Sequence, residues 1–74
     1  MRIRATISTT IRAKPDSEAS ASSQLMTGQS LPIYGRTSDS TWFTISRQGT
    51  LWLPAADVEI IEGYLSNLPV VAPA

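Results

Sequence analysis

The chain has no cysteine and no histidine, and it carries a single lysine. Without these side chains it cannot form a disulfide, a cysteine or histidine metal site, or a catalytic triad that uses histidine as its base. Six basic residues balance six acidic residues, so the net charge is zero. A neutral chain attracts neither a phosphate backbone nor an anionic membrane surface, and we therefore expect no nucleic-acid partner.

Long apolar runs are also missing. No segment approaches the ~20 apolar residues of a transmembrane helix, so we expect no membrane span. Arg2 and Arg4 precede alternating residues rather than an apolar run, so no signal peptide is visible. The chain does have 42% hydrophobic residues, which is enough for a folded core. Its 74 residues allow one small domain, and a domain of this size is marginally stable.

Short alternating segments dominate the chain and predict an all-β fold. Residues 2–12, for example, alternate between aliphatic or small side chains on one face and polar side chains on the other. This period is typical of a half-buried strand. Five such segments with close turns predict a small barrel or sandwich. We expect the strands at residues 2–12, 29–36, 41–47, 50–53 and 58–61.

Three segments depart from this alternation. Residues 13–24 are polar, rich in serine and contain one proline, so we expect a long loop there. Pro54 suits the first position of a helical turn, which we expect at residues 54–57. Residues 62–74 contain two prolines and four larger aliphatic side chains, which predicts an extended tail that packs on the domain or on a partner. The expected organisation is a β domain at residues 1–61 followed by this tail.

The order of these pieces resembles the bacterial Src-homology-3-like (SH3b) family. The resemblance rests on an aliphatic–arginine strand end, a proline in the next loop, a glycine turn and two strands led by tryptophan. It covers about residues 5 to 61 and implies a small five-stranded SH3-like barrel with one short 3-10 turn and an extended C-terminal tail. Its motifs are Ile11-Arg12, Pro15, Leu25 with Gly28, Leu31-Pro32-Ile33-Tyr34-Gly35-Arg36, Trp42-Phe43-Thr44-Ile45 and Leu51-Trp52-Leu53-Pro54-Ala55-Ala56-Asp57-Val58.

The eukaryotic relatives of this family bind polyproline helices in an aromatic groove. By position, Trp42 matches the groove tryptophan and Pro54 the groove proline. The groove tyrosines have no counterpart, since none lies near residues 10–14 and Asp57 replaces the last one. Leu51 also replaces the glycine that the family has before the second tryptophan. The resemblance therefore implies a binding module of the cell envelope or exterior whose ligand is a cell-wall peptide, a glycan or another protein, rather than a proline-rich peptide.

Aromatic side chains are the best candidates for ligand contact. Strand alternation places Trp42 on the other face of its strand from Phe43, and Trp52 on the other face from Leu53. Both indoles are therefore expected on one surface with Tyr34 nearby. Stacked aromatic rings suit sugars, peptides or a partner protein. The alternative is that the indoles cover the second face of the sheet as a minor outer cluster.

Charged side chains form a second set of candidates. We expect Arg12 to bond loop carbonyls or to pair with Asp16 or Glu18, and its alternative role is to clamp a ligand carboxylate. Asp57 and Glu59 are expected on one face of a strand, and paired carboxylates can hydrolyse glycosides. Two solvated acids are the simpler interpretation, so we expect no catalytic residue, no metal site and no cofactor.

The sequence therefore predicts a non-catalytic binding module of the bacterial cell envelope or exterior, not an enzyme. A second hypothesis is a structural subunit that assembles with its own copies into an oligomer or filament through the tail and a sheet edge. Zero net charge, the aliphatic tail and the small core motivate this alternative. The expected ligand groove consists of Arg12, Tyr34, Trp42, Trp52 and Pro54.

Overall fold

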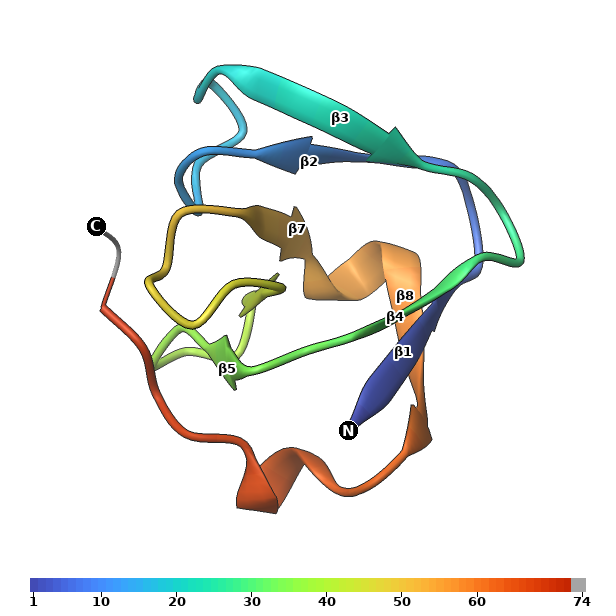
Figure 1. Cartoon of the computed structure of the whole chain (residues 1–74), viewed down its shortest axis with the longest axis vertical. Coiled ribbons are helices and arrows are strands. Elements are labelled where there is room, and N and C mark those ends of the chain that lie inside the picture. Colours follow the sequence, from blue (N-terminus) through green and yellow to red (C-terminus); the bar gives the residue numbers. More distant parts are fainter. Residues whose placement is uncertain (73–74) are drawn as a thin grey trace.

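The computed structural model of this chain describes residues 1–72, which form eight short strands and two 3-10 turns (Figure 1). The strands lie in two antiparallel sheets, so the predicted all-β class is confirmed. They do not form the predicted single barrel of five strands, because they are divided between the two sheets. No helix in the described part of the chain is long and apolar enough to cross a membrane.

The strands form one sheet of three and one sheet of five. They are β1 (Arg2–Ala5), β2 (Thr9–Arg12), β3 (Ala21–Leu25), β4 (Ser30–Pro32), β5 (Gly35–Arg36), β6 (Trp42–Thr44), β7 (Trp52–Pro54) and β8 (Val58–Glu62). The 3-10 turns are η1 (Ala55–Asp57) and η2 (Leu65–Asn67). The smaller sheet has the order β4-β1-β8, and the larger sheet has the order β3-β2-β7-β6-β5. The turn η1 confirms the helical turn predicted at residues 54–57, except that Pro54 ends β7 and precedes the first helical residue. The turn η2 was not predicted.

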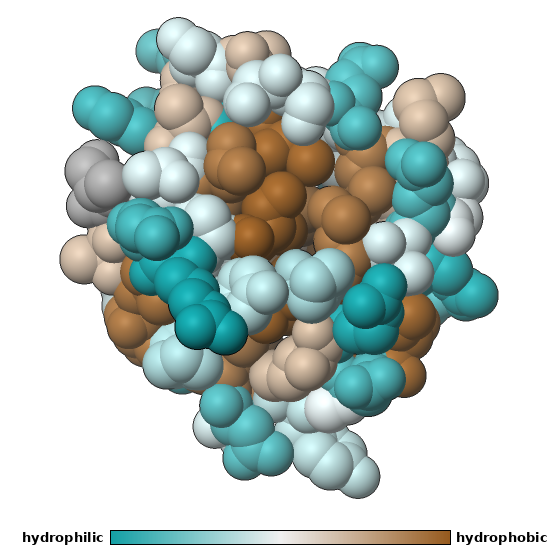
Figure 2. All heavy atoms as spheres, in the orientation of Figure 1, coloured by the Kyte–Doolittle hydropathy of each residue, from teal (hydrophilic) through white to brown (hydrophobic). Residues whose placement is uncertain are grey.

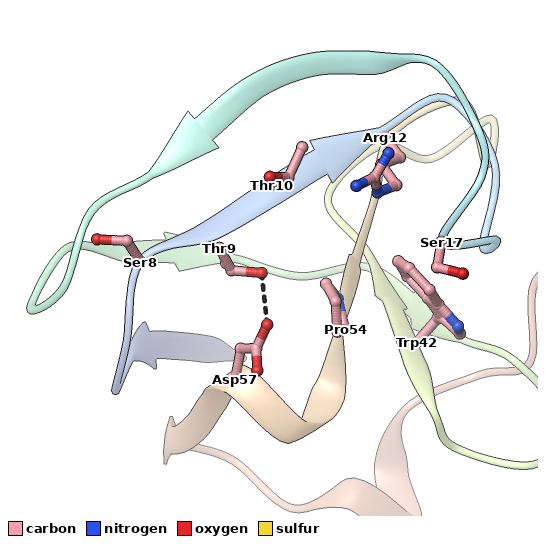
Figure 3. Close-up of a pocket in the computed structure, with 8 residues that line it drawn as sticks. All are labelled: Ser8, Thr9, Thr10, Arg12, Ser17, Trp42, Pro54 and Asp57. Atoms are coloured by element: carbon pink, nitrogen blue, oxygen red, sulfur yellow. Dashed lines mark hydrogen bonds between the residues drawn. The ribbon is translucent and has the colours of Figure 1, made fainter.

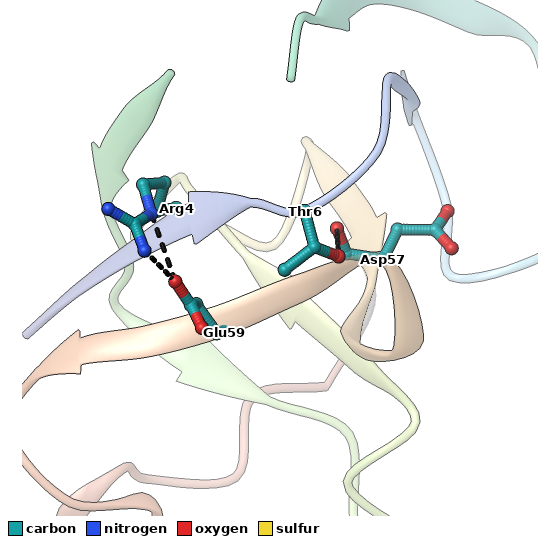
Figure 4. A network of polar contacts seen from close by, with 4 residues as sticks. All are labelled: Arg4, Thr6, Asp57 and Glu59. Atoms are coloured by element: carbon teal, nitrogen blue, oxygen red, sulfur yellow. Dashed lines mark hydrogen bonds and ion pairs between the residues drawn. The ribbon is translucent and has the colours of Figure 1, made fainter. Parts of the chain in front are cut away.

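The long first strand that the sequence predicts is interrupted at residues 6–8, where the chain passes from one sheet to the other. Strand β1 belongs to the smaller sheet and β2 to the larger sheet. Thr6 holds this bend, because its N–H and its hydroxyl donate to the carbonyl of Asp57 at 2.9 and 3.0 Å (Figure 4). Ile7 is exposed at the bend instead of joining the buried face. Alternation alone does not show where a strand changes sheets.

The polar segment expected to be a long loop contains strand β3. This strand pairs antiparallel with β2, and the register places Thr10 opposite Gln24 and Ile11 opposite Ser23. Leu25 is the one buried residue of β3. Backbone hydrogen bonds to β2, rather than buried side chains, therefore hold this strand in place. A pattern of alternating burial cannot reveal such a strand.

The two sheets enclose a common core. Two threonines, Thr9 and Thr44, are also buried. Thr44 is fully buried and satisfies its hydroxyl by donating to the carbonyl of Leu51 at 2.8 Å. The apolar side chains of the core come from both sheets, from the segment between β4 and β5, and from the tail. They are Ile3, Ala5, Ile11, Leu25, Ile33, Phe43, Leu53 and Leu68.

The C-terminal tail folds back onto the domain along β5. Leu68 is 4% exposed and belongs to the core. The N–H of Arg36 donates to the carbonyl of Pro69 at 3.0 Å, and the N–H of Val71 donates to the carbonyl of Arg36 at 2.9 Å. Gly35 permits this close approach, because an added Cβ would collide with the side chain of Val71. The described tail thus packs on its own chain, while residues 73 and 74 of the expected tail lie outside the described residues.

Truncation of Leu68 tests whether the tail contributes to the core. Leu68→Ala is expected to lower the free energy of unfolding by about 2–5 kcal/mol, because it removes a buried side chain and leaves a cavity. Leu65→Ala is the matched control in the same tail, since Leu65 is 39% exposed, and we expect a much smaller loss. Urea denaturation followed by tryptophan fluorescence measures both values. Equal losses in the two variants would contradict the docking of the tail through Leu68.

Candidate functional site

Three of the five residues expected to bind a ligand line one pocket of about 360 Å³ (Figure 3). Arg12 lies at the end of β2, Trp42 at the start of β6, and Pro54 at the end of β7. These three strands are neighbours in the larger sheet, which explains how the residues come together. The other residues that line the pocket are polar: Ser8, Thr9, Thr10, Ser17 and Asp57.

Trp42 supplies the aromatic wall of the pocket. The register of the sheet places it directly opposite Pro54, so the indole and the proline ring lie beside each other (Figure 3). The side chain of Ser17, from the loop between β2 and β3, points toward the same indole. Trp42 is only half-buried and remains accessible from the pocket. A flat apolar surface with hydroxyls at its rim suits a ligand that has both apolar and polar groups.

The turn before β6 fixes the position of Trp42. The N–H of Thr37 donates to the carbonyl of Trp42 at 3.0 Å, and the N–H of Trp42 donates to the hydroxyl of Thr37 at 3.2 Å. The carboxylate of Asp39 accepts hydrogen bonds from the hydroxyls of Thr37 at 2.6 Å and Thr41 at 2.7 Å. These bonds, the one from Thr37 first, lower the pKa of Asp39 from 3.8 to about 2. The ionised carboxylate therefore stabilises the turn that presents Trp42.

Asp57 forms the opposite end of the pocket. It ends η1, and its Oδ2 accepts a hydrogen bond from the hydroxyl of buried Thr9 at 2.8 Å (Figure 3). Its Oδ1 has no hydrogen-bond partner within residues 1–72, so this oxygen can accept a bond from a ligand. The expectation that Asp57 and Glu59 share one strand face is wrong. Asp57 precedes strand β8 and faces the pocket. Glu59 lies within β8 and forms an exposed ion pair with Arg4 of β1 (Figure 4).

Arg12 is anchored by the loop between β2 and β3. Its Nη1 donates to the carbonyl of Ala19 at 2.7 Å, which confirms the predicted bond to a loop carbonyl. Asp16 does not pair with Arg12 and accepts the N–H of Glu18 at 2.9 Å instead. The Nε and Nη2 groups of Arg12 form no hydrogen bond within the described residues. These two groups can therefore donate hydrogen bonds to a ligand carboxylate, as the predicted clamp requires.

Trp52 does not contribute to the pocket, and the expectation that both indoles share an exposed surface is wrong. Its side chain is 0% exposed, and its Nε1 donates to the carbonyl of Gly49 at 2.7 Å. Gly49 has a φ of +72°, and a Cβ added there would lie 2.7 Å from the carbonyl oxygen of Ala72 and 3.4 Å from the indole. The turn at Gly49 and the tail therefore cover the indole. Trp52 is therefore closed to a ligand and belongs to the interior of the fold.

Tyr34 is the second expected residue that lies outside the pocket. It precedes β5, where its N–H donates to the carbonyl of Thr44 at 3.0 Å. Its ring is 38% exposed, and the guanidinium carbon of Arg47 lies 5.3 Å from the ring centroid. This distance allows a cation–π contact. Tyr34 therefore stacks with Arg47 and does not line the pocket that contains Trp42.

Five polar residues of the pocket were not predicted to contact a ligand. Four of them carry hydroxyls, and serine and threonine are too abundant in this chain for a hydroxyl alone to mark a site. The fifth, Asp57, had a usable signal, because it follows Pro54 by one helical turn and Pro54 was already a candidate. No group of three or more acidic residues within residues 1–72 lies close enough together to hold a metal ion. The pocket thus combines one guanidinium, one carboxylate, several hydroxyls and one indole.

Asp39→Asn tests the turn that holds Trp42. Because the folded state lowers the pKa of Asp39, the ionised carboxylate stabilises the protein fully above about pH 4, and this contribution is lost as the pH falls toward 2. We expect the variant to be less stable than the wild type at pH 7 and to lack this part of the pH dependence. Urea midpoints measured between pH 2 and pH 7 check both points.

Glu62→Gln is the control for this experiment, since it removes an exposed carboxylate outside the turn. We expect it to keep the wild-type loss of stability in the same pH range. An Asp39→Asn variant that loses stability with falling pH as steeply as Glu62→Gln would contradict the assigned role of Asp39.

Comparison with known proteins gives no relative from which the function of the pocket could be inferred. A scan of protein-family models, a search of curated proteins and a search of solved structures found no match to this chain. The chemistry of Arg12, Trp42 and Asp57 therefore carries the functional inference.

Proposed function

We propose that this chain is a non-catalytic binding module that holds a short peptide in the pocket between Arg12, Trp42 and Asp57. The observation that carries this proposal is that a guanidinium, a carboxylate and an accessible indole line the same pocket. A peptide can offer a carboxylate to the free Arg12 nitrogens, an amine or N–H to Asp57 Oδ1 and an apolar side chain to Trp42. A neutral glycan could use the indole and the hydroxyls but would leave both charges without a partner.

The resemblance to the SH3b family supports the same function. The polar loop between β2 and β3, the short β6–β7 hairpin and the 3-10 turn before the last strand follow the order that the resemblance implies. We propose that the two sheets are a variant of the five-stranded SH3-like barrel. In this variant Trp42 and Pro54 keep the positions of the groove tryptophan and the groove proline, and they lie side by side.

The side chains of the pocket favour binding over catalysis. The chain has no histidine or cysteine that could act as a base or a nucleophile beside the pocket serines and threonines. Asp57 is the only carboxylate among the lining residues, and Glu59 is paired with Arg4 elsewhere. A pair of carboxylates about 5 to 9 Å apart, which glycoside hydrolysis requires, is therefore not available in this pocket.

We further propose the bacterial cell envelope or exterior as the location and a cell-wall peptide as the ligand class. This part rests on the family resemblance together with a surface made polar by hydroxyls more than by charges, since only 16% of residues are charged. Opposite charges in one small pocket agree with a ligand that carries both an amine and a carboxylate.

Trp42→Ala tests the pocket as the binding site. We expect the affinity for isolated bacterial peptidoglycan to fall at least about tenfold, because a central aromatic contact commonly contributes more than 1.4 kcal/mol. Tyr34→Ala is the matched control, since it removes a partly exposed aromatic ring outside the pocket, and we expect it to bind like the wild type. Co-sedimentation with peptidoglycan and titration with the soluble peptides released from it measure the affinities.

The melting temperature of each variant separates binding from folding. A fall of many degrees in Trp42→Ala would show that Trp42 is a core residue and would contradict its role in the site. Equal affinities of Trp42→Ala and the wild type would contradict the proposed function. Binding of the wild type to peptide-free glycan strands, without binding to the released peptides, would contradict the assignment of a peptide ligand.

A further inference from the structure

The outer edges of the two sheets differ in how they are protected against pairing with another strand. The edge of β5 is occupied by the tail through the bonds of Arg36 to Pro69 and Val71. The edge strand β4 contains Pro32, which has no N–H to donate. The edge strand β8 carries Glu59 and Glu62, whose charges oppose pairing with a second copy. Three of the four edges therefore carry one of the usual protective features.

Within residues 1–72, the fourth edge, β3, has no covering segment, no proline and no charge. Its pairing with β2 is irregular between Ala21 and Ser23, while Ser23, Gln24 and Leu25 pair with β2 in regular register. Within the described residues it pairs only with β2, and it is the outermost strand of the larger sheet (Figure 1). Residues 21–24 are exposed, small or unbranched, and uncharged. An unpaired strand presents a row of backbone N–H and C=O groups that can bond to another strand. The backbone of β3 is thus free to extend the sheet.

A largely apolar groove of about 310 Å³ lies beside this edge. It separates β3 from β4, which are the facing edges of the two sheets. Figure 2 shows hydrophobic side chains gathered in the middle of this face, between the positions that β3 and β4 occupy in Figure 1. A strand that pairs with β3 can therefore also bury side chains in the groove. Its apolar lining residues are Ile11, Leu25, Leu31 and Ile45.

We propose that β3 pairs antiparallel with β3 of a second copy of this chain. Residues 19–35 contain no charged side chain, so the pairing places no like charges opposite each other. The chain as a whole is neutral, so two copies do not repel each other at a distance. Antiparallel pairing of a strand with itself has two-fold symmetry and closes after two copies. The expected product is a dimer in which one sheet continues across both chains.

The choice of a second copy follows from the composition of the edge. The exposed β3 residues are alanine, serine and glutamine, and serine and glutamine can hydrogen-bond to the same residues on the opposite strand. No charge on β3 selects a partner of opposite charge. No residue of β3 lines the pocket that contains Trp42, so the dimer leaves that pocket open and the inference does not depend on the proposed ligand.

Ser23→Lys tests this interface at the middle residue of β3. Two lysines near the symmetry axis would repel each other, so we expect the dimer dissociation constant to rise at least about tenfold. Ser66→Lys is the matched control, since it adds the same charge at an exposed position of η2. Sedimentation equilibrium over a range of concentrations measures the mass of each protein. We expect the wild type and Ser66→Lys to reach twice the mass of one chain at concentrations where Ser23→Lys remains monomeric.

Two results of this experiment would overturn the proposal. One is a wild type that stays monomeric at every concentration. The edge of β3 would then pair with a strand of a different protein or with no strand. The other is a Ser23→Lys variant that is folded by circular dichroism and dimerises as tightly as the wild type. If the Ser23→Lys variant does not fold, cysteine cross-linking tests the proposal instead.

Cross-linking uses the absence of native cysteine. Directly opposite residues of antiparallel strands have Cα atoms ~4.5–5.5 Å apart, which is within the span of a disulfide. We expect at least one of three single-cysteine variants, at Ser22, Ser23 and Gln24, to form a disulfide-linked dimer with oxidised glutathione at least about tenfold faster than Ser66→Cys. Rates no faster than that of Ser66→Cys in all three variants would overturn the proposal.

Discussion

The burial of Trp52 beneath the turn at Gly49 and the C-terminal tail is the interaction on which the rest of this structure depends. Strand β7, which carries Trp52, lies at the centre of the larger sheet and pairs with both β2 and β6. The bond from the indole to the Gly49 carbonyl satisfies its one polar atom. Leu53, the next residue of β7, is buried in the common core. A chain too small for a large core therefore buries side chains on both faces of its central strand.

This arrangement determines which aromatic side chain can act in binding. Trp52 is fully buried and belongs to the fold, while Trp42, on the neighbouring strand, remains accessible in the pocket. The same tail that covers Trp52 also pairs with β5, the strand that pairs with β6, and Trp42 is the first residue of β6. The bonds of Asp39 then hold the turn between β5 and β6. Fold and site are thus connected through one short segment of sheet.

Alternation of polar and apolar residues predicted the all-β class and most of the strands, and β1 and β2 do bury every second side chain. It missed β3, which is held by backbone bonds, and the bend at residues 6–8, where a strand changes sheets. In the pocket, Trp42 and Pro54 were predicted from their positions in the family resemblance, and Arg12 was a candidate clamp for a carboxylate. The sequence left open whether Trp52 is buried, because the tail that lies against the Gly49 turn is distant from Trp52 in the sequence and only the folded chain brings it there.

The most direct test of this account is the fluorescence of Trp42→Phe, in which Trp52 is the only tryptophan. The account predicts a blue-shifted emission that acrylamide does not quench in the native protein, because the remaining indole is fully buried. Urea should shift this emission to the red and expose it to the quencher in the same transition that unfolds the protein. An emission that is already red-shifted and quenched in the native state would contradict the burial of Trp52.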